Sequence, residues 1–194
     1  MIAVKRLGIL ISGRGSNFEA IARNIREGKL KAEIAIVISN KADAKGIETA
    51  RGLRLNVVVI ESKGKTREQH DAEMIAALET ANVDLVCLAG YMRLLLPSFV
   101  QAFPGRVLNI HPSLLPAFPG LDAQKQALEA GVKVTGCTVH YVDELLDHGP
   151  IILQKEVPVL SGDTVESLSA RILEQEHVAY SEAIAEIIKD KESK

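Results

Sequence analysis

The sequence predicts an α/β domain built on a doubly wound, mostly parallel sheet. Up to Ile110, short runs rich in Val, Ile and Leu alternate with amphipathic stretches of helical length. Several of these runs are apolar throughout, which is typical of strands covered on both faces. Strands that alternate with helices in this way favour right-handed crossovers, and therefore a parallel sheet with helices on both sides.

The part of the chain up to Ile110 is expected to hold five strands and four helices. The expected strands are residues 7–11, 33–39, 56–60, 83–88 and 107–110. The expected helices are residues 18–27, 45–54, 67–80 and 97–103. Thr66 can cap the third helix, and Pro97 suits the first turn of the fourth, where the missing N–H costs no hydrogen bond.

The pattern changes after Ile110. Residues 111–120 contain three prolines and predict an ordered loop. A short helix is expected at 123–130, followed by strands at 132–142 and 151–157 that flank a loop at 143–150. A long helix is expected from Thr164 to about Lys189. Asp163 before it and Glu166, three residues on, have the spacing of a capping box. Its buried side is predicted to carry Val165, Leu168, Ile172, Ala179 and Ile187.

The composition is that of one globular domain. With 194 residues, 47% of them hydrophobic, the chain can bury one sizeable core. Its formal net charge of −2 argues against a nucleic-acid partner. Cys87 and Cys137 lie in apolar runs and are expected to be buried hydrophobes, and neither CxxC nor HExxH occurs, so no metal site is predicted. No apolar stretch approaches ~20 residues and no signal-peptide pattern is seen, which predicts a cytoplasmic protein without a membrane partner.

A glycine-containing loop, Ser12-Gly13-Arg14-Gly15-Ser16-Asn17, separates the first strand from the first helix. Glycines let backbone N–H groups approach an anion, and the helix N-terminus favours negative charge. Ser16 and Asn17 would add short side-chain donors there. The third glycine of a dinucleotide fingerprint and the Lys-Ser/Thr of a P-loop are both missing. A phosphomonoester is therefore the natural ligand, and a plain capped turn is the alternative.

Two further segments carry groups suited to chemistry. Asn109 and His111 are two apart on a strand and share a face at its carboxyl end, where open parallel sheets place their ligands. An amide beside an imidazole suits an oxyanion and a proton transfer. The loop after the next strand carries Asp143, Glu144 and Asp147, and spacing alone does not single out one of them.

Four segments together resemble the glycinamide ribonucleotide branch of the folate-dependent formyltransferase family. These are Asn-Ile-His-Pro-Ser-Leu-Leu-Pro at 109–116 followed by Gly120, the run from Gly136 to Gly149, Ser12–Asn17, and Ala-Gly-Tyr-Met-Arg at 89–93. The likeness covers nearly the whole chain. It implies a Rossmann-like formyltransferase fold over 1–194, with a ribonucleotide-binding half at 1–105 and a catalytic and folate-binding half at 106–190.

The resemblance also implies an activity and a set of residues. The formyl group of 10-formyltetrahydrofolate would pass to the amine of glycinamide ribonucleotide, in purine biosynthesis. No metal or tightly bound cofactor would be needed, and the chain would be a monomer or a weak homodimer. The catalytic group would be Asn109, His111 and Asp147. The ribonucleotide would contact Gly15, Ser16, Asn17 and Glu176. The folate would contact Arg67, Met92, Arg93, Leu94, Leu95, Asn109, Asp143, Glu144, Leu145 and Leu146.

Two departures from the family pattern affect this expectation. Leu173 stands where relatives often have a polar residue near the phosphate, and Asp122-Ala123-Gln124 replaces a stretch that often contains histidine. Arg14 is variable in the family and could supplement the phosphate site. Two alternative functions stay open: hydrolysis of 10-formyltetrahydrofolate by the same three catalytic residues, and nucleotide sensing without catalysis.

Overall fold

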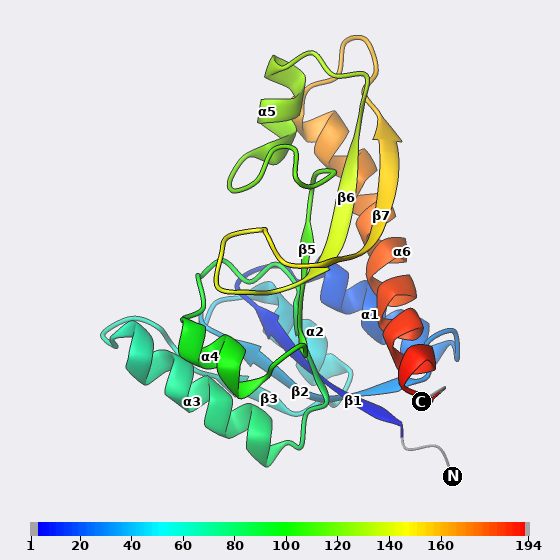
Figure 1. Ribbon diagram of the computed structural model, residues 1–194. Coiled ribbons are helices and arrows are strands. Elements are labelled where there is room, and N and C mark those ends of the chain that lie inside the picture. The colour runs from blue at the N-terminus through cyan, green and yellow to red at the C-terminus, as the bar shows by residue number, and fades with distance from the viewer. Residues whose placement is uncertain (1–3, 193–194) are drawn as a thin grey trace.

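The chain forms a sheet with helices on both faces (Figure 1). The computed structural model describes residues 4–192, with side chains up to Lys189. The strands are β1 (Lys5–Ile11), β2 (Ala32–Ser39), β3 (Val57–Val59), β4 (Leu85–Leu88), β5 (Val107–His111), β6 (Val134–Tyr141) and β7 (Ile151–Pro158). The helices are α1 (Ser16–Arg26), α2 (Lys45–Gly52), α3 (Arg67–Thr80), α4 (Pro97–Ala102), α5 (Ala123–Glu129) and α6 (Val165–Glu192).

The strand order is β3-β2-β1-β4-β5-β6-β7. Neighbouring strands from β3 to β5 are parallel, whereas β6 and β7 are antiparallel additions at one edge. The predicted doubly wound, mostly parallel sheet is therefore confirmed. The winding reverses between β1 and β4, so the loops that follow these two strands open where sheets of this kind bind ligands. The two loops touch there, because the Ser12 N–H donates to the Gly90 carbonyl at 3.2 Å.

Two apolar cores cover the two faces of the sheet. Leu7, Ile9 and Ile11 of β1 belong to the core beneath α1, α2 and α6. Leu10 points the other way, into the core beneath α3 and α4. This alternation of buried side chains explains why the strands read as apolar throughout, and it confirms that they are covered on both faces.

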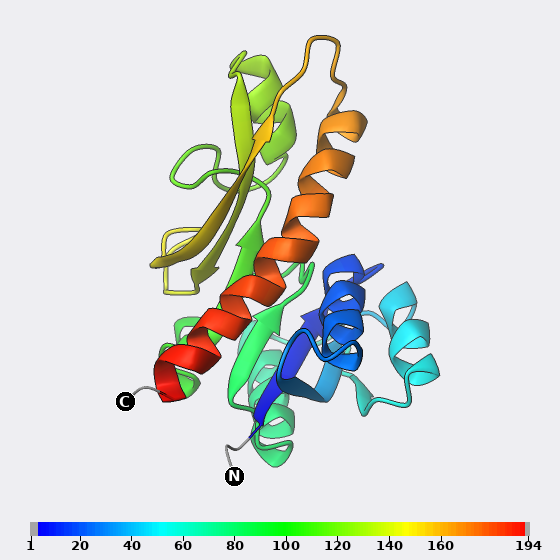
Figure 2. The same cartoon turned by 90° about the vertical axis from the view of Figure 1, so that its right-hand side faces the viewer.

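Helix α6 lies along the sheet with α1 beside it (Figure 2). Its predicted core positions Leu168, Ile172, Ala179 and Ile187 are buried. Tyr180 of this helix is fully buried, and its hydroxyl lies 3.1 Å from the Leu88 carbonyl oxygen and 3.0 Å from that of Leu108. One helix side chain thereby joins β4 and β5, the strands that lead into two of the loops described below.

Three local predictions for the second half are wrong. Thr164 and Ser167 cap α6, and not the predicted Asp163 and Glu166. The backbone N–H of each of the two capping residues donates to the hydroxyl of the other. Val165 is 38% exposed, because α6 begins near the far tip of the molecule (Figure 2). His111 ends β5 and does not begin the loop, because pairing with Thr138 of β6 extends the ladder by one residue.

Two other local predictions, the cap of α3 and the burial of both cysteines, are confirmed. Thr66 caps α3 in a capping box that it forms with Gln69. Cys87 and Cys137 are fully buried, and burial raises the pKa of each thiol to about 12. Among the described residues, none of the helices is long and apolar enough to cross a lipid bilayer.

Candidate active site

Four polar side chains meet near the carboxyl end of β5. Asn109 and His111 come from β5, His140 comes from β6, and Asp147 comes from the loop between β6 and β7. Because β5 and β6 are antiparallel in this register, Asn109 lies opposite His140. The structure thus brings together the three residues that the sequence grouped as catalytic, and it adds a second histidine to them.

Asp147 contacts the other three side chains. Its Oδ2 lies 3.3 Å from His111 Nδ1 and accepts a hydrogen bond of 2.8 Å from the Gly120 N–H. Its Oδ1 lies 3.5 Å from Asn109 Nδ2 and 3.9 Å from His140 Nε2. The side chain is 7% exposed, so its carboxylate acts on these partners in a poorly screened environment.

The other two carboxylates of the same loop point elsewhere. Asp143 pairs with His148 at 2.8 Å, and this hydrogen bond lowers the pKa of Asp143. Glu144 accepts a hydrogen bond of 3.1 Å from Gln101 of α4. The structure therefore separates Asp147 from its two neighbours, which the spacing of the sequence did not do.

His111 is buried between two acceptors. Its Nε2 lies 2.9 Å from the Phe118 carbonyl oxygen, and its Nδ1 faces Asp147. A ring with hydrogens on both nitrogens donates to both acceptors, whereas a neutral ring leaves one of them facing a lone pair. Both ring nitrogens of His111 are therefore within reach of an oxygen acceptor.

His140 is the residue of this cluster that sequence reasoning missed. Its Nδ1 lies 2.9 Å from the Tyr141 carbonyl oxygen and donates to it, which leaves Nε2 as an acceptor for the Asn109 amide at 3.2 Å. Burial lowers the pKa of His140, so the neutral ring is favoured. His140 thus sets which way the Asn109 amide points. The signal was its place within the Gly136–Gly149 motif, but the strand register that pairs it with Asn109 is not readable from sequence.

The path of the loop between β6 and β7 determines where Asp147 points. Asp147 has a φ of 49°, in the left-handed region that favours Gly, Asn and Asp. At Gly149 the loop passes so close to β6 that a Cβ would lie 1.8 Å from the Tyr141 carbonyl oxygen. Only glycine fits there, and the Tyr141 N–H then donates to the Pro150 carbonyl at 2.9 Å. These features hold the Asp147 carboxylate over β5.

The predicted phosphate loop leads into α1 through a left-handed residue. Gly15 precedes the helix with a φ of 74°, and no side chain caps this helix end. The first-turn N–H groups and the helix dipole can therefore act on an anion. The Asn17 side chain already uses one of the two hydrogens on its Nδ2, which donates to Glu176 Oε2 at 2.8 Å.

Glu176 lies in α6 against this loop. Both it and Asn17 are buried, and burial raises the pKa of Glu176, while the Asn17 hydrogen bond opposes that shift. The contact joins residues 159 positions apart, so it links the last helix to the first loop. The structure therefore brings together two of the residues that the sequence assigned to the ribonucleotide.

The residues predicted to hold the folate include four exposed apolar side chains. Met92 and Leu94, in the loop between β4 and α4, are 74% and 55% exposed. Leu145 and Leu146, beside Asp147, are 61% and 58% exposed. Large apolar side chains that remain exposed next to buried polar groups are typical of ligand sites.

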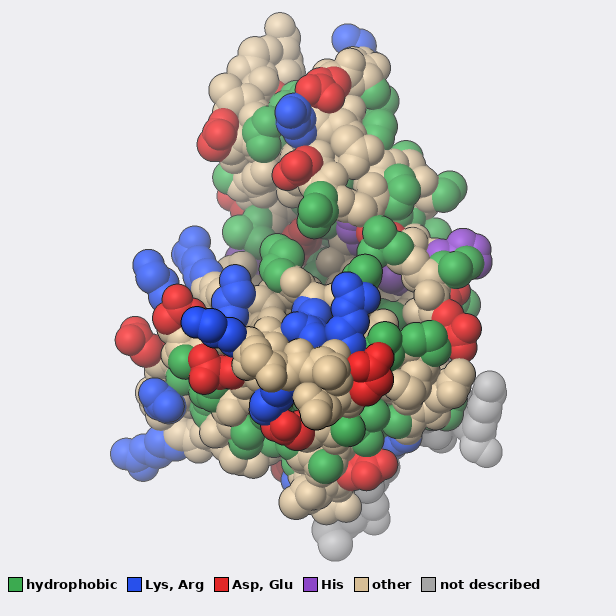
Figure 3. All heavy atoms as spheres, turned by 90° about the vertical axis from the view of Figure 1, so that its left-hand side faces the viewer, with side chains coloured by type: hydrophobic (Ala, Val, Ile, Leu, Met, Phe, Trp, Pro, Cys, Tyr) green, Lys and Arg blue, Asp and Glu red, His purple; other side chains and the backbone are tan. Residues whose placement is uncertain are grey.

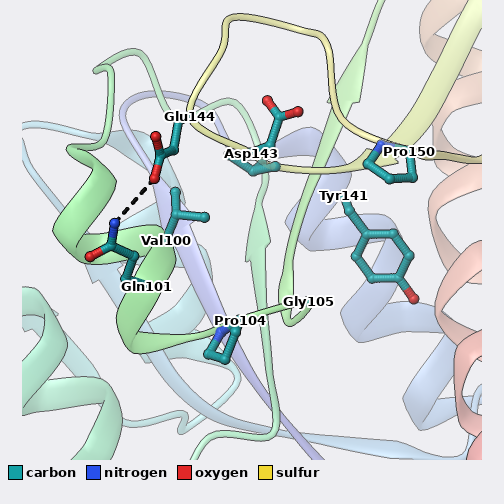
Figure 4. A pocket seen from close by; sticks show the side chains of 9 residues that line it. Val100, Gln101, Pro104, Gly105, Tyr141, Asp143, Glu144 and Pro150 are labelled. Carbon is teal, nitrogen blue, oxygen red and sulfur yellow. Dashed lines mark hydrogen bonds between the residues drawn. The ribbon is translucent and has the colours of Figure 1, made fainter.

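A cavity of about 440 Å³ lies between α4 and the loop that carries Asp143 and Glu144 (Figure 4). Val100 and Gln101 of α4 line its other side, and the Gln101 amide points at Glu144 across it. Sequence reasoning assigned Asp143 and Glu144 to the folate and did not consider Val100 and Gln101, which line this cavity with them. An apolar helix face with a few polar groups offers room for part of a flat ring system.

Arg67 is not linked to this region. It is exposed at the first position of α3, and no hydrogen bond or ion pair among the described residues joins it to the cluster or to the cavity. Its assignment to the folate stays a prediction.

A hollow separates the two lobes of the molecule on the face that Figure 3 shows, and histidine and acidic side chains lie within it. Several Lys and Arg side chains gather on the lobe below the hollow. Among side chains up to Lys189, no group of three or more His, Cys, Asp and Glu has an arrangement that could hold a metal ion.

Comparison with known proteins identifies similar chains. A family model described as formyl transferase matches residues 5–184. The chain is 47% identical over 173 residues to the phosphoribosylglycinamide formyltransferase of Escherichia coli (strain K12). This alignment covers 89% of this chain and 82% of the relative. It is 51% identical over 184 residues to the trifunctional purine biosynthetic protein adenosine-3 of Drosophila pseudoobscura pseudoobscura. That match covers 93% of this chain but only 14% of the length of the relative.

A solved structure agrees with the fold in detail. The crystal structure of glycinamide ribonucleotide transformylase 1 from Symbiobacterium toebii superposes with a TM-score of 0.94 at 53% identity. The alignment covers 96% of this chain and 89% of that one. The similarity thus extends over the elements that carry the Asn109–Asp147 cluster.

Proposed function

The chain belongs to the formyl transferase family, and on that premise we propose that it is a phosphoribosylglycinamide formyltransferase. It transfers the formyl group of 10-formyltetrahydrofolate to the primary amine of glycinamide ribonucleotide. The products are formylglycinamide ribonucleotide and tetrahydrofolate, in a step of de novo purine biosynthesis. Because the chain spans only 14% of the trifunctional relative, no other activity of that relative is carried over.

The observation that carries the proposal is the meeting of Asn109, His111 and Asp147 at one strand end. An amide, an imidazole held beside a carboxylate, and that carboxylate are the groups that acyl transfer to an amine requires. Attack of the amine on the formyl carbon forms a tetrahedral oxyanion, which hydrogen-bond donors stabilise. The attacking amine must lose a proton, and the departing folate nitrogen must gain one.

The contacts of the cluster support a role for each residue. The Asn109 amide donates to the oxyanion, and so does His111 through Nδ1, whose 3.3 Å contact with Asp147 is the longer of its two ring contacts. At 3.5 Å, the hydrogen bond between Asn109 Nδ2 and Asp147 is the longest that Asn109 makes, so an oxyanion can compete for that hydrogen. Such bonds often tighten only when the reacting groups are in place. Asp147 relays protons from the attacking amine to the folate nitrogen through water.

The loop before α1 supports binding of the ribonucleotide phosphate. Gly15, Ser16 and Asn17 hold the phosphate mainly through backbone N–H groups, and Arg14 lies next to them. Glu176, fixed by Asn17, hydrogen-bonds the ribose hydroxyls. In this arrangement the acceptor amine reaches the cluster from the side of α1 and α6.

The pterin lies against the loops on the other side. Asp143, Glu144, Leu145 and Leu146 wall it from the β6–β7 loop, while Met92, Arg93, Leu94 and Leu95 wall it from the β4–α4 loop. The cavity at Val100 and Gln101 adjoins the first of these walls. Folate is a consumed cosubstrate in this scheme, so no tightly bound cofactor or metal takes part. We place the enzyme in the cytoplasm, as a monomer or weak homodimer of one domain.

Ser16→Asp is expected to raise KM for glycinamide ribonucleotide by about tenfold or more, because two negative charges then meet at the start of α1. An acidic residue in the first turn of a helix is stabilising, so the fold should not suffer. KM for 10-formyltetrahydrofolate should stay near the wild-type value. Steady-state kinetics with each substrate varied in turn measure both constants.

The uncharged Ser16→Asn variant is the matched control and should change KM for the ribonucleotide much less. No turnover of the two substrates by the wild-type protein would refute the proposed activity itself. Equal damage to both Michaelis constants would show instead that the phosphate lies elsewhere.

A further inference from the structure

His70 and Asp71 form a buried pair in the second turn of α3, outside the cluster described above. The two side chains are 0% and 1% exposed. His70 Nε2 donates to the Ile60 carbonyl oxygen at 2.9 Å, which ties α3 to the end of β3. Burying a carboxylate costs free energy unless hydrogen bonds or an ion pair compensate for it, so the partners of Asp71 show what keeps it there.

Asp71 accepts a hydrogen bond from a distant loop. Its Oδ2 lies 2.8 Å from the Leu96 backbone nitrogen. Leu96 precedes the first residue of α4 and follows Met92–Leu95, the segment assigned to the pterin wall. The carboxylate therefore fixes the point at which that segment ends, and α3 and α4 are in contact there (Figure 1).

The same loop is held at its beginning by other groups. The Met92 N–H donates to Ser12 Oγ at 2.8 Å, next to the phosphate loop. The Tyr91 hydroxyl donates to the Met74 sulfur of α3 at 3.4 Å. Burial, and then the charge of Asp71, raises the pKa of Tyr91, which places Asp71 close to that side chain as well. Between these hydrogen-bonded ends of the loop, the Met92 and Leu94 side chains remain exposed.

The His70 ring lies beside the Asp71 carboxylate without a hydrogen bond to it. His70 Nδ1 and Asp71 Oδ1 lie 3.6 Å apart, and neither of these buried atoms has a hydrogen-bond partner among the described residues. With Nε2 committed to Ile60, Nδ1 is the ring atom that faces Asp71. The ring therefore occupies the side of the carboxylate that Leu96 leaves open.

We propose that Asp71 is a positioning residue for the folate cosubstrate, which acts by holding the Leu96 end of the pterin-binding loop. This inference rests on the proposed function, since it concerns the same folate site. Asp71 touches no reacting group. Its effect reaches the substrate through the backbone of the loop, so it should alter folate affinity more than ribonucleotide affinity.

Three variants separate this role from a general loss of packing. Asp71→Ala removes the acceptor of the Leu96 N–H. Asp71→Asn keeps an oxygen for that N–H and turns an amide toward His70 Nδ1. Leu78→Ala truncates another fully buried side chain of α3 that packs in the core below and does not hold the loop.

The experiment measures three quantities in each folded variant. They are the hydrogen exchange of the segment 90–96, the Kd of tetrahydrofolate by calorimetry, and KM for each substrate. Asp71→Ala should speed exchange at Leu96 and raise both the Kd of tetrahydrofolate and KM for 10-formyltetrahydrofolate by about tenfold or more, the usual effect of losing a hydrogen bond to a charged group. KM for the ribonucleotide should be unchanged. Asp71→Asn should restore near-wild-type values, and Leu78→Ala should leave the segment protected.

Unchanged exchange and folate affinity in Asp71→Ala would overturn the inference. So would an Asp71→Asn variant as weak as Asp71→Ala, or a Leu78→Ala variant that weakens folate equally. If the wild-type protein bound no tetrahydrofolate and turned over no substrate, the proposed function would fail instead. The exchange measurement would still decide whether Asp71 holds the loop.

Discussion

Replacing His111 or Asn109 with alanine is expected to lower kcat by roughly 10² to 10³, the usual loss for a general acid or an oxyanion donor. His111 is the ring that lies 3.3 Å from the Asp147 carboxylate. Asn109 carries the amide that His140 orients. Each variant removes one donor from the position where negative charge develops, so kcat should fall much more than the substrate affinities.

The matched control is His148→Ala. His148 is a largely exposed histidine that follows Asp147 in the same loop, and its ring pairs with Asp143. It should keep most of the wild-type rate. Near-normal turnover by a folded Asn109→Ala or His111→Ala protein, verified by thermal unfolding, would remove that residue from the catalytic group.

Asp147→Asn should be nearly as damaging, and its design isolates charge. Asparagine tolerates the left-handed conformation that Asp147 adopts at a φ of 49°, and its oxygen can still accept from the Gly120 N–H. The backbone of the loop should therefore keep its path. What is lost is the negative charge beside His111 and the base that relays the proton.

Asp143→Asn and Glu144→Gln are the controls for this charge change. Their carboxylates face His148 and Gln101, so kcat should change little and the folate KM should show most of the effect. Similar losses of kcat in all three variants would show that the loop supplies a diffuse negative field. In that case the specific assignment of Asp147 would be wrong.

The sequence predicted what depends on local pattern. The apolar strands, the Thr66 cap and the shared face of Asn109 and His111 follow from periodicity and propensity, and all are seen in the structure. The capping of α6 was misplaced by one residue because Asp163, Thr164, Glu166 and Ser167 offer two overlapping pairs, and the Asp163 carboxylate is paired with Arg171 of the same helix.

What sequence could not give was set by long-range contacts. Asp147 differs from Asp143 and Glu144 because the loop crosses β6 at Gly149, which no spacing reveals. His140 enters the cluster through the register of β5 against β6. Asn17 turned inward because Glu176, far along the chain, accepts from its amide.

The central claim is that this protein moves a formyl group to a phosphorylated amine, and the rate of tetrahydrofolate release tests it most directly. Holding the acceptor amine against the formyl carbon can be worth several kcal/mol relative to a nucleophile that is not held. A hydrolase using the same three residues would have no need of the loop at Gly15–Asn17. Tetrahydrofolate release from labelled 10-formyltetrahydrofolate should therefore be slow alone, rise by orders of magnitude when glycinamide ribonucleotide is added, and leave the label on the acceptor amine. Fast release that is insensitive to the ribonucleotide, with the label recovered as formate, would contradict the account.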